Sequence, residues 1–318
     1  MSQNPYNKKI NNQIALDFAI RDALNEPIIC GYSITDKKEL YYNYMSNEAW
    51  EEFKNDMSYE HKQQYKDGHG GELNEKDGTP PKMASFGSSI RLIYLLSKDV
   101  AGFSFEEKLS TKVGRPANLD GYLKTEEHDI YVEAKCREIY GSYANQKISK
   151  VYKDVYDFIR EKNGLFGYRD TEIKDDKRHF KCTFTWDDKE IIHFEIKQLI
   201  CHFLGICANI LDKKKKKKNA NPNVRFIYLI FNPKVDTDFS NEHIKGFEKE
   251  IIEDYDKTLK EISWFKDFGW LFDIIMDYQI GKWKCKSKSR PEWSFRFDMV
   301  DQKQYRDHIK PYLSNERD

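Results

Sequence analysis

The chain has 318 residues, of which 14% are aromatic and 33% charged, and its 53 Lys and Arg residues balance its 53 Asp and Glu residues. This length allows one large domain or two modest ones, and the aromatic content is enough for a sizeable core. A net charge of zero argues against nucleic-acid binding over the whole surface, although it leaves room for a local basic groove.

Cysteine spacing and hydropathy argue against a zinc-binding, a secreted and a membrane-spanning protein. The six cysteines are scattered, and none forms the short CxxC pairs typical of a structural zinc site. The first residues contain no continuous apolar segment, so no secretory signal is expected. No stretch approaches the roughly 20 apolar residues of a membrane span. We therefore expect a cytoplasmic protein with reduced thiols and no membrane partner.

The N-terminal region, residues 1–82, is expected to be helical. Apolar residues at helical spacing predict a helix over 9–24, and residues 46–66 predict further, strongly polar helical structure. The segment 67–82 is rich in Gly and Pro, which is typical of a loop. It marks a boundary with the region that follows.

The middle of the chain, residues 83–232, predicts an α/β core with the order helix, three strands, inserted section, helix, strand. The first three strands can form a meander, and the last needs a crossover, so we expect a mixed β-sheet flanked by helices. The C-terminal part, 233–318, is expected to be an α/β extension packed on this core. The elements predicted for the core are a helix at 85–98, strands at 103–111, 117–124 and 129–135, an insertion at 137–190 with a helix near 148–160 and a strand at 179–186, a helix at 191–212 and a buried strand at 224–231.

Two carboxylates and a lysine are expected on one face of the hairpin formed by the second and third strands. If the turn is centred between Glu126 and Glu127, antiparallel pairing places Asp120 opposite Glu133, with Cβ atoms about 4.5–5.5 Å apart. Lys135 follows two residues later and projects from the same face. Carboxylates this close repel by about 4 kcal/mol at an effective dielectric near 20. Lys135 and a hard divalent cation would relieve that repulsion, and together they supply the parts needed for phosphodiester hydrolysis.

Asp120, followed by Glu133-Ala134-Lys135 at the end of an apolar strand, resembles the signature of the PD-(D/E)XK nuclease superfamily. The string RPANLDGYL…YVEAKCREIYG resembles, more narrowly, an uncharacterised bacterial restriction-endonuclease-like family. The resemblance covers residues 83–232 and implies a restriction-endonuclease-like fold. It also implies that Asp120, Glu133 and the Ala134 carbonyl bind Mg²⁺ (or Mn²⁺), while Lys135 positions the nucleophile. The expected function is that of a metal-dependent deoxyribonuclease, with a restriction-type endonuclease among the options.

The motif departs from the PD-(D/E)XK pattern at one position, because Leu119 precedes Asp120 where the superfamily name has proline. Several other residues are weaker candidates for the site. Glu107, on the strand before Asp120, is a candidate third metal ligand or a surface residue paired with a lysine. Gln198 lies on a polar stripe of the following helix with Glu195 and His202. In several relatives a helix glutamine contacts the metal-bound water or the phosphate, but a solvent-facing stripe fits equally well. The remaining polar residues have an ordinary or unassigned role: Ser88 and Ser89 at a helix start, Glu138 after the motif, and His128 and His202, which lack metal-ligand spacing.

Two basic segments invite a nucleic-acid interpretation. The six consecutive lysines at 213–218 repel one another, so a solvated loop is the expected structure. Segment 147–169 interleaves basic and aromatic residues, which suits contact with backbone phosphates but equally describes an amphipathic helix with an aromatic core side.

Three alternatives to a nuclease stay open. Asp120 and Glu133 can be a solvated pair with Lys135 as their salt-bridge partner, although the apolar residues alternating with Glu133 argue for a buried strand. The chain can also be a non-catalytic DNA-binding or assembly module that keeps the fold, or an unrelated fold whose hairpin mimics the motif. The sequence leaves open DNA or RNA, internal sites or ends, sequence specificity and homodimer formation.

Overall fold

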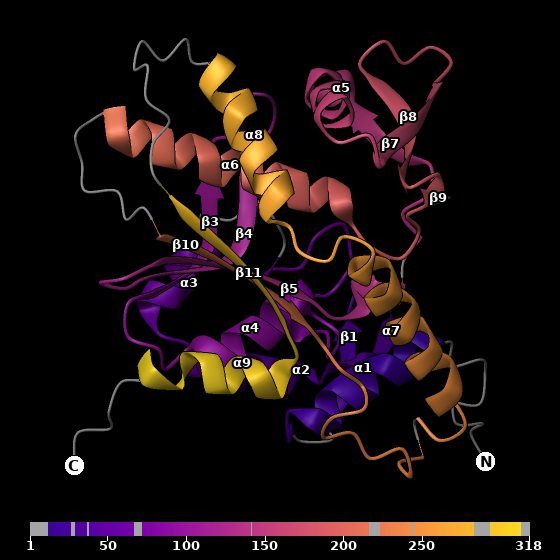
Figure 1. The fold of residues 1–318 in the computed structure, drawn as a ribbon. Coiled ribbons are helices and arrows are strands. Elements are labelled where there is room, and N and C mark those ends of the chain that lie inside the picture. The colour runs from indigo at the N-terminus through magenta and orange to yellow at the C-terminus, as the bar shows by residue number, and fades with distance from the viewer. Residues whose placement is uncertain are drawn as a thin grey trace.

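The computed structural model describes residues 12–26, 29–36, 38–66, 72–140, 142–215, 223–242, 244–282 and 293–312. At its centre lies a five-stranded mixed sheet with the strand order β11-β10-β5-β4-β3 (Figure 1). The first three strands form an antiparallel meander, and the last two run parallel to the third. The predicted mixed α/β class is therefore confirmed. The strands of this sheet are β3 (Phe103–Leu109), β4 (Ala117–Lys124), β5 (Asp129–Lys135), β10 (Asn223–Ile230) and β11 (Ser294–Val300).

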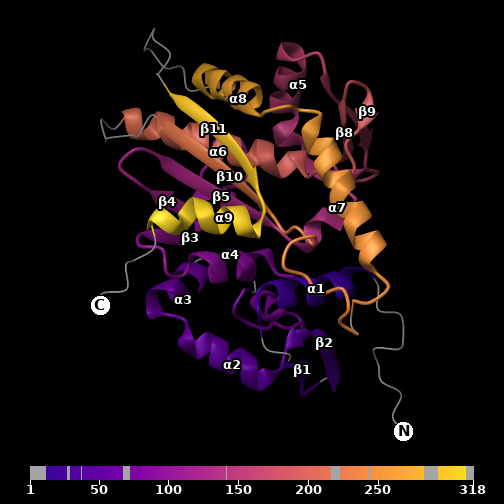
Figure 2. The ribbon, with the colours of Figure 1, turned by 60° about the horizontal axis from the view of Figure 1, so that its bottom comes forward.

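Helices cover both faces of this sheet, as Figures 1 and 2 show. Buried residues gather in two clusters, one on each side. Strand β5 contributes to both because its side chains alternate: Tyr131 belongs to one cluster, and Ile130, Val132 and Ala134 belong to the other. One face carries α6 (Ile196–Lys215) and α8 (Gly269–Lys282), and the other carries α1 (Asn12–Ala23), α4 (Ser89–Ser97) and α9 (Gln302–Ile309).

The core elements follow the predicted order. Helix α4 precedes the meander, and α6 makes the crossover from β5 to the parallel strand β10. The predicted bounds of β4 and β5 agree with the structure, since their apolar alternation is bounded by turn residues. Helix α6 begins five residues later than predicted and includes Lys213, which the sequence placed in a solvated loop. Residues 216–218 of the lysine run lie outside the described residues.

The N-terminal region contains a β-hairpin where only helices were predicted. Strands β1 (Cys30–Ile34) and β2 (Glu39–Met45) pair antiparallel, and α2 (Asn47–Asp56) and α3 (Tyr59–Lys66) follow. Tyr32 and Ile34 are buried at a spacing of two, which is the strand signature that the sequence prediction missed. The purely helical prediction for residues 1–82 was wrong for this reason.

The inserted section builds a small antiparallel sheet with one helix packed against it. Its sheet has the order β6-β8-β7, with β9 paired to β8. Aromatic side chains fill the space under the helix: the Tyr156 and Phe184 rings lie 5.0 Å apart, and Phe166 and Phe184 lie 5.8 Å apart. Strand β8 was predicted, whereas β6 and β7 were not. The elements are β6 (Gln146–Ser149), α5 (Lys153–Lys162), β7 (Phe166–Glu172), β8 (His179–Trp186) and β9 (Lys189–Glu190).

The C-terminal residues complete the sheet and its covering. Helix α7 (Glu248–Ser263) and α8 precede β11, which extends the sheet beside β10, and α9 follows. Among the described residues no helix combines the length and apolar character needed to cross a membrane. Short 3₁₀ turns occur at Lys82–Ala84, Arg137–Tyr140, Lys150–Tyr152 and Lys310–Tyr312.

Candidate active site

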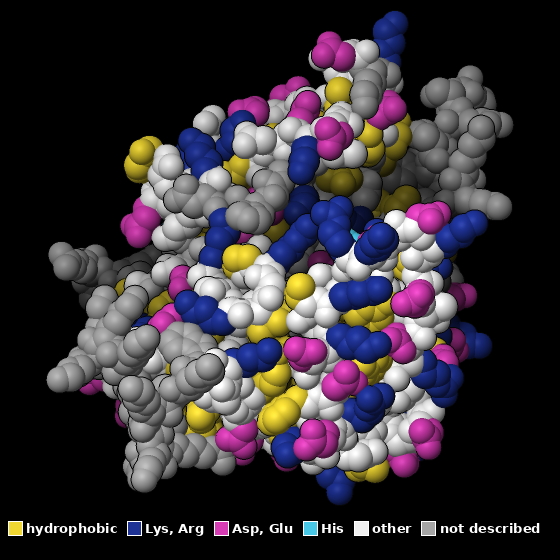
Figure 3. All heavy atoms as spheres, turned by 90° about the horizontal axis from the view of Figure 1, so that it is seen from above, with side chains coloured by type: hydrophobic (Ala, Val, Ile, Leu, Met, Phe, Trp, Pro, Cys, Tyr) yellow, Lys and Arg dark blue, Asp and Glu magenta, His cyan; other side chains and the backbone are white. Residues whose placement is uncertain are grey.

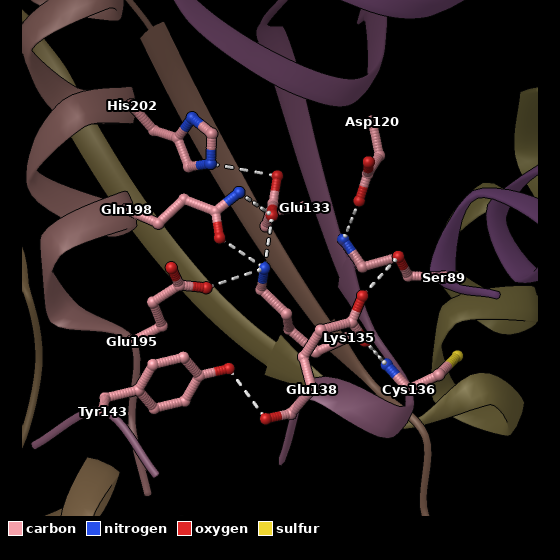
Figure 4. A network of polar contacts seen from close by, with 11 residues as sticks. Ser89, Asp120, Glu133, Lys135, Cys136, Glu138, Tyr143, Glu195, Gln198 and His202 are labelled. Atoms are coloured by element: carbon pink, nitrogen blue, oxygen red, sulfur yellow. Dashed lines mark hydrogen bonds and ion pairs between the residues drawn. The ribbon is translucent and has the colours of Figure 1, made fainter. Parts of the chain in front are cut away.

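The predicted pairing of β4 with β5 is confirmed by their register. Gly121 pairs with Val132 and Tyr122 with Tyr131, which makes Asp120 and Glu133 the next positions along the two strands. The ladder itself stops at Gly121, because the Asp120 carboxylate accepts the backbone N–H of Ala134 at 2.7 Å. Asp120 therefore points at the backbone of β5, whereas Glu133 and Lys135 point toward α6 (Figure 4). The expectation that all three side chains share one face needs this correction.

Glu133 lies at the centre of a buried polar network. Its side chain is 2% exposed, and Oε1 accepts a hydrogen bond from Gln198 Nε2 at 2.7 Å. The same oxygen lies 2.9 Å from Lys135 Nζ. His202 Nε2 lies 3.0 Å from Glu133 Oε2 without the angles of a hydrogen bond, so this buried oxygen has no hydrogen-bond partner among the described residues. Gln198 and His202 are four residues apart and therefore lie on one side of α6.

Lys135 is held as an ammonium group by several oxygen atoms. Its Nζ donates to Gln198 Oε1 at 2.5 Å and to Glu195 Oε2 at 3.4 Å, in addition to its contact with Glu133. Burial disfavours the charged form, but Glu133, together with Tyr228, Glu195 and Glu138, outweighs it and raises the pKa of Lys135 well above its usual range. Lys135 is thus suited to donate hydrogen bonds to a water or a phosphate oxygen, and not to accept a proton.

The two carboxyl groups have opposite pKa shifts. Burial raises the pKa of Glu133, but Lys135 and His202 together lower it to about 2. Burial, then the charges of Glu133 and Glu106, raise the pKa of Asp120 well above its usual range. Such divergent shifts within a small region are typical of functional sites, although structural ion pairs also produce them.

The third carboxylate beside Asp120 comes from Glu106, and the prediction of Glu107 needs correction. Glu106 lies between the pairs Phe105–Gly121 and Glu107–Leu119, opposite Asp120, and it has a φ of 57°. Burial, followed by the charge of Glu72, raises its pKa to about 7.

Glu107 follows Glu106 on β3 and pairs with Leu119, but its carboxylate interacts with a different charge. Its pKa is raised by burial, and the one charge that opposes the shift is that of Lys213 near the C-terminal end of α6. Fifteen residues separate Lys213 from Gln198, which corresponds to about 22 Å of helix at 1.5 Å per residue. The charge that acts on the Glu107 carboxylate thus lies at the far end of α6 from Gln198, so Glu106 is the better candidate for the third carboxylate.

The remaining predicted residues have structural contacts. Ser88 caps α4 by accepting the N–H of Arg91, and Ser89 donates to Glu138 Oε1 at 3.1 Å. Glu138 Oε2 also accepts the N–H of Cys136, so it connects the start of α4 to the end of β5. His128 lies in the turn, 3.8 Å from the exposed Glu127. From the sequence, His202 was expected to lie at the surface or to have its hydrogen bonds satisfied without a role in the site. In the structure it is 2% exposed and contacts Glu133.

The oxygen donors of this site match the chemistry of a hard divalent cation. Asp120, Glu133 and the Ala134 carbonyl are oxygen ligands of the kind that Mg²⁺ prefers. Glu133 Oε2 is buried next to His202 and accepts no hydrogen bond from the residues that the structure describes, so it keeps acceptor capacity for such an ion. Within the described residues, no group of three or more His, Cys, Asp or Glu side chains has the geometry of a metal site. The Asp120 Oδ2 atom accepts the Ala134 N–H, which leaves Asp120 Oδ1 as the atom available to such an ion.

Comparison with protein-family models, with characterised proteins and with solved structures gives no match. The interpretation of the site therefore depends on its own geometry.

Proposed function

We propose that this chain is a metal-dependent nuclease with a restriction-endonuclease-like fold, which hydrolyses DNA phosphodiester bonds at Asp120, Glu133 and Lys135. The observation that carries the proposal is the buried Glu133–Lys135–Gln198 network at the carboxyl end of β5. Burying an ion pair costs desolvation energy that attraction alone often fails to recover, so such a pair is weak evidence for a stabilising role. The order of α4, the meander, α6 and β10 is the order that the superfamily resemblance implies.

Asp120, Glu133 and the Ala134 carbonyl would hold Mg²⁺ or Mn²⁺. When bound, this ion would supply positive charge at the phosphate and lower the pKa of a coordinated water. The Lys135 ammonium donates to the attacking water or to a phosphate oxygen. Gln198 fixes both Glu133 and Lys135 through its two amide atoms, which keeps the ammonium oriented.

The test is cleavage of supercoiled plasmid with Mg²⁺ or Mn²⁺, comparing wild type with Glu133→Gln and Lys135→Met. We expect both variants to lose at least about a hundredfold in rate, as for removal of a group that acts on the transition state. Lys189→Met is a matched control, because Lys189 is 64% exposed and lies 3.8 Å from Asp187. A single substitution can leave a buried charge unpaired, so the double variant E133Q/K135M, which removes both charges, checks that the fold survives. If folded E133Q still cleaves the plasmid at the wild-type rate, the proposal is wrong.

One observation favours the alternative of a non-catalytic DNA-binding or assembly module. The Asp120 carboxylate is engaged by the backbone of β5 and does not face the same point as Glu133. DNA binding without cleavage under either metal would establish this alternative, and the same assay with single-stranded RNA would test the other polymer.

A further inference from the structure

A cavity of about 710 Å³ lies between the β3–β4 loop, the inserted section and α6. This volume falls within the roughly 300–1,000 Å³ typical of ligand sites. The insertion and α8 rise on the side of the molecule that is viewed in Figure 3, where Lys and Arg side chains gather around hollowed surface. The candidate active site uses none of the residues that line this cavity.

Three cationic side chains on the wall of the cavity have no carboxylate partner within the described part of the chain. Arg115, Arg178 and Lys197 form no ion pair and no side-chain hydrogen bond with any residue that the structure describes. By contrast, Lys147 at the same cavity lies 2.7 Å from Asp176, and the nearby Lys153 lies 2.5 Å from Asp170. In a chain whose charges balance overall, unpaired cations around a concavity produce a local positive potential that attracts anions.

Besides Lys147, Ser149 and His179, the rest of the wall is mostly apolar and includes a fixed aromatic ring. Tyr152 is partly buried, and its hydroxyl donates to the Arg115 carbonyl at 3.3 Å. A Cβ at Gly114 would lie 2.6 Å from that hydroxyl oxygen, so the loop packs directly against the ring. Ile148, which is 2% exposed, also lines the cavity. An aromatic face beside cations is the combination that binds a nucleotide through its base and its phosphate.

We propose that this cavity binds one nucleotide unit of a nucleic-acid strand, with its phosphate at Arg115, Arg178 and Lys197 and its base against Tyr152. The choice of a strand over a free nucleotide follows from the position of the cavity on α6. Lys197 and Cys201 line the cavity, while Gln198 and His202, each one residue further, belong to the Glu133 network. The two sites therefore occupy neighbouring sides of the same helical turns, as a substrate strand passing both would require.

This inference deepens the proposed nuclease function, because the strand held in the cavity would be the DNA next to the cleaved bond. Binding can still be measured without cleavage. The probe is a fluorescein-labelled single-stranded DNA oligonucleotide, titrated by anisotropy with the E133Q protein over a range of salt concentrations. A duplex of the same sequence and a mononucleotide competitor are tested in parallel.

We expect Arg178→Gln and Lys197→Gln each to weaken binding several-fold and to reduce the salt slope by about 0.7, the value for one lost phosphate contact on a single strand. Arg160→Gln is the matched control, because Arg160 is 53% exposed, lies 2.8 Å from Asp157 and is not part of the cavity wall. Tyr152→Leu should weaken binding about fivefold or more without changing the salt slope. Tyr152→Phe keeps the ring, so it should bind like the parent.

The possible outcomes separate this proposal from the nuclease proposal. Binding by R178Q and K197Q equal to that of R160Q would overturn the cavity assignment, even if wild type cleaves DNA. DNA binding that depends on these cations and on the Tyr152 ring would support it, even if no metal produces cleavage and the nuclease proposal fails. A mononucleotide that binds as tightly as the oligonucleotide would identify a free-nucleotide site and overturn the assignment to a strand.

Discussion

Glu261 should be among the most costly single residues to replace, because it connects α7 to the start of α6. It is 5% exposed, and its carboxylate accepts three successive backbone N–H groups: those of Ile192 at 3.0 Å, His193 at 2.6 Å and Phe194 at 2.9 Å. These residues directly precede α6, which carries Gln198. Loss of the carboxylate should therefore disturb both the stability of the fold and the placement of the site.

The magnitude follows from the three hydrogen bonds. A hydrogen bond to a charged group contributes about 1.5–3 kcal/mol, and a buried N–H left without a partner costs about 1–3 kcal/mol. These contributions are not additive, and single substitutions rarely exceed about 4–5 kcal/mol. We expect Glu261→Ala to lower the free energy of unfolding by about 3–5 kcal/mol. Glu261→Gln keeps one acceptor oxygen, so it should lose about 1–2 kcal/mol.

The assay is urea unfolding followed by tryptophan fluorescence, with stability taken from the midpoint and slope. Glu253→Ala on the same helix is the control, because Glu253 is 52% exposed and lies 3.8 Å from Lys249. Its loss should cost no more than about 0.5 kcal/mol. If E261A and E253A unfold at the same urea concentration, the three amides find other partners and the argument fails.

Two further substitutions test the packing around the site. Burial outweighs the attraction of Arg137 and the hydrogen bond from Asn43, and it raises the pKa of Asp17 from 3.8 to about 6. The folded state thus holds this proton more tightly than the unfolded chain. The contribution of Asp17 is therefore greatest below about pH 4, and it falls by about 3 kcal/mol as the pH rises through 6. The difference in unfolding free energy between wild type and Asp17→Asn should follow this fall in urea titrations, and a difference that is constant with pH would contradict it. Gly121→Ala places a Cβ 2.2 Å from the buried Phe103 ring, so it should cost about 1–3 kcal/mol. Thermal unfolding measures that loss, and an unchanged midpoint would mean that the ring moves freely.

The sequence predicted the parts of the site that depend on local pattern. The β4–β5 register follows from alternation and the position of the turn, and it places Asp120 beside Glu133 as the structure has it. The wrong choice of Glu107 has a local cause as well. The prediction assumed that side chains on β3 alternate regularly between the two faces of the sheet. Glu106 has a φ of 57°, which interrupts this alternation. No residue type at that position signals the irregularity.

The helix contribution to the site was less predictable because it depends on tertiary packing. The polar stripe of Glu195, Gln198 and His202 was visible, but sequence alone could not decide whether it faces solvent or the sheet. In the structure it packs over β5, and His202 is buried against Glu133. A helix that covers a sheet usually packs its apolar face on the sheet and turns its polar stripe to solvent. The sequence pattern therefore offered no reason to expect this stripe to face β5, and only the tertiary packing shows that it does.

The topology also explains why the insertion lies next to the candidate site. A crossover between parallel strands leaves the first strand at its carboxyl end, and the helix returns from that same edge. Lys135 ends β5, the insertion follows, and α6 begins with the turns that carry Gln198. Any segment inserted at this point must therefore emerge beside Glu133 and Lys135, where a nuclease would contact the strand that flanks the cut. Under the proposed function, the insertion would enlarge the DNA-binding surface without any change to the sheet that holds the site.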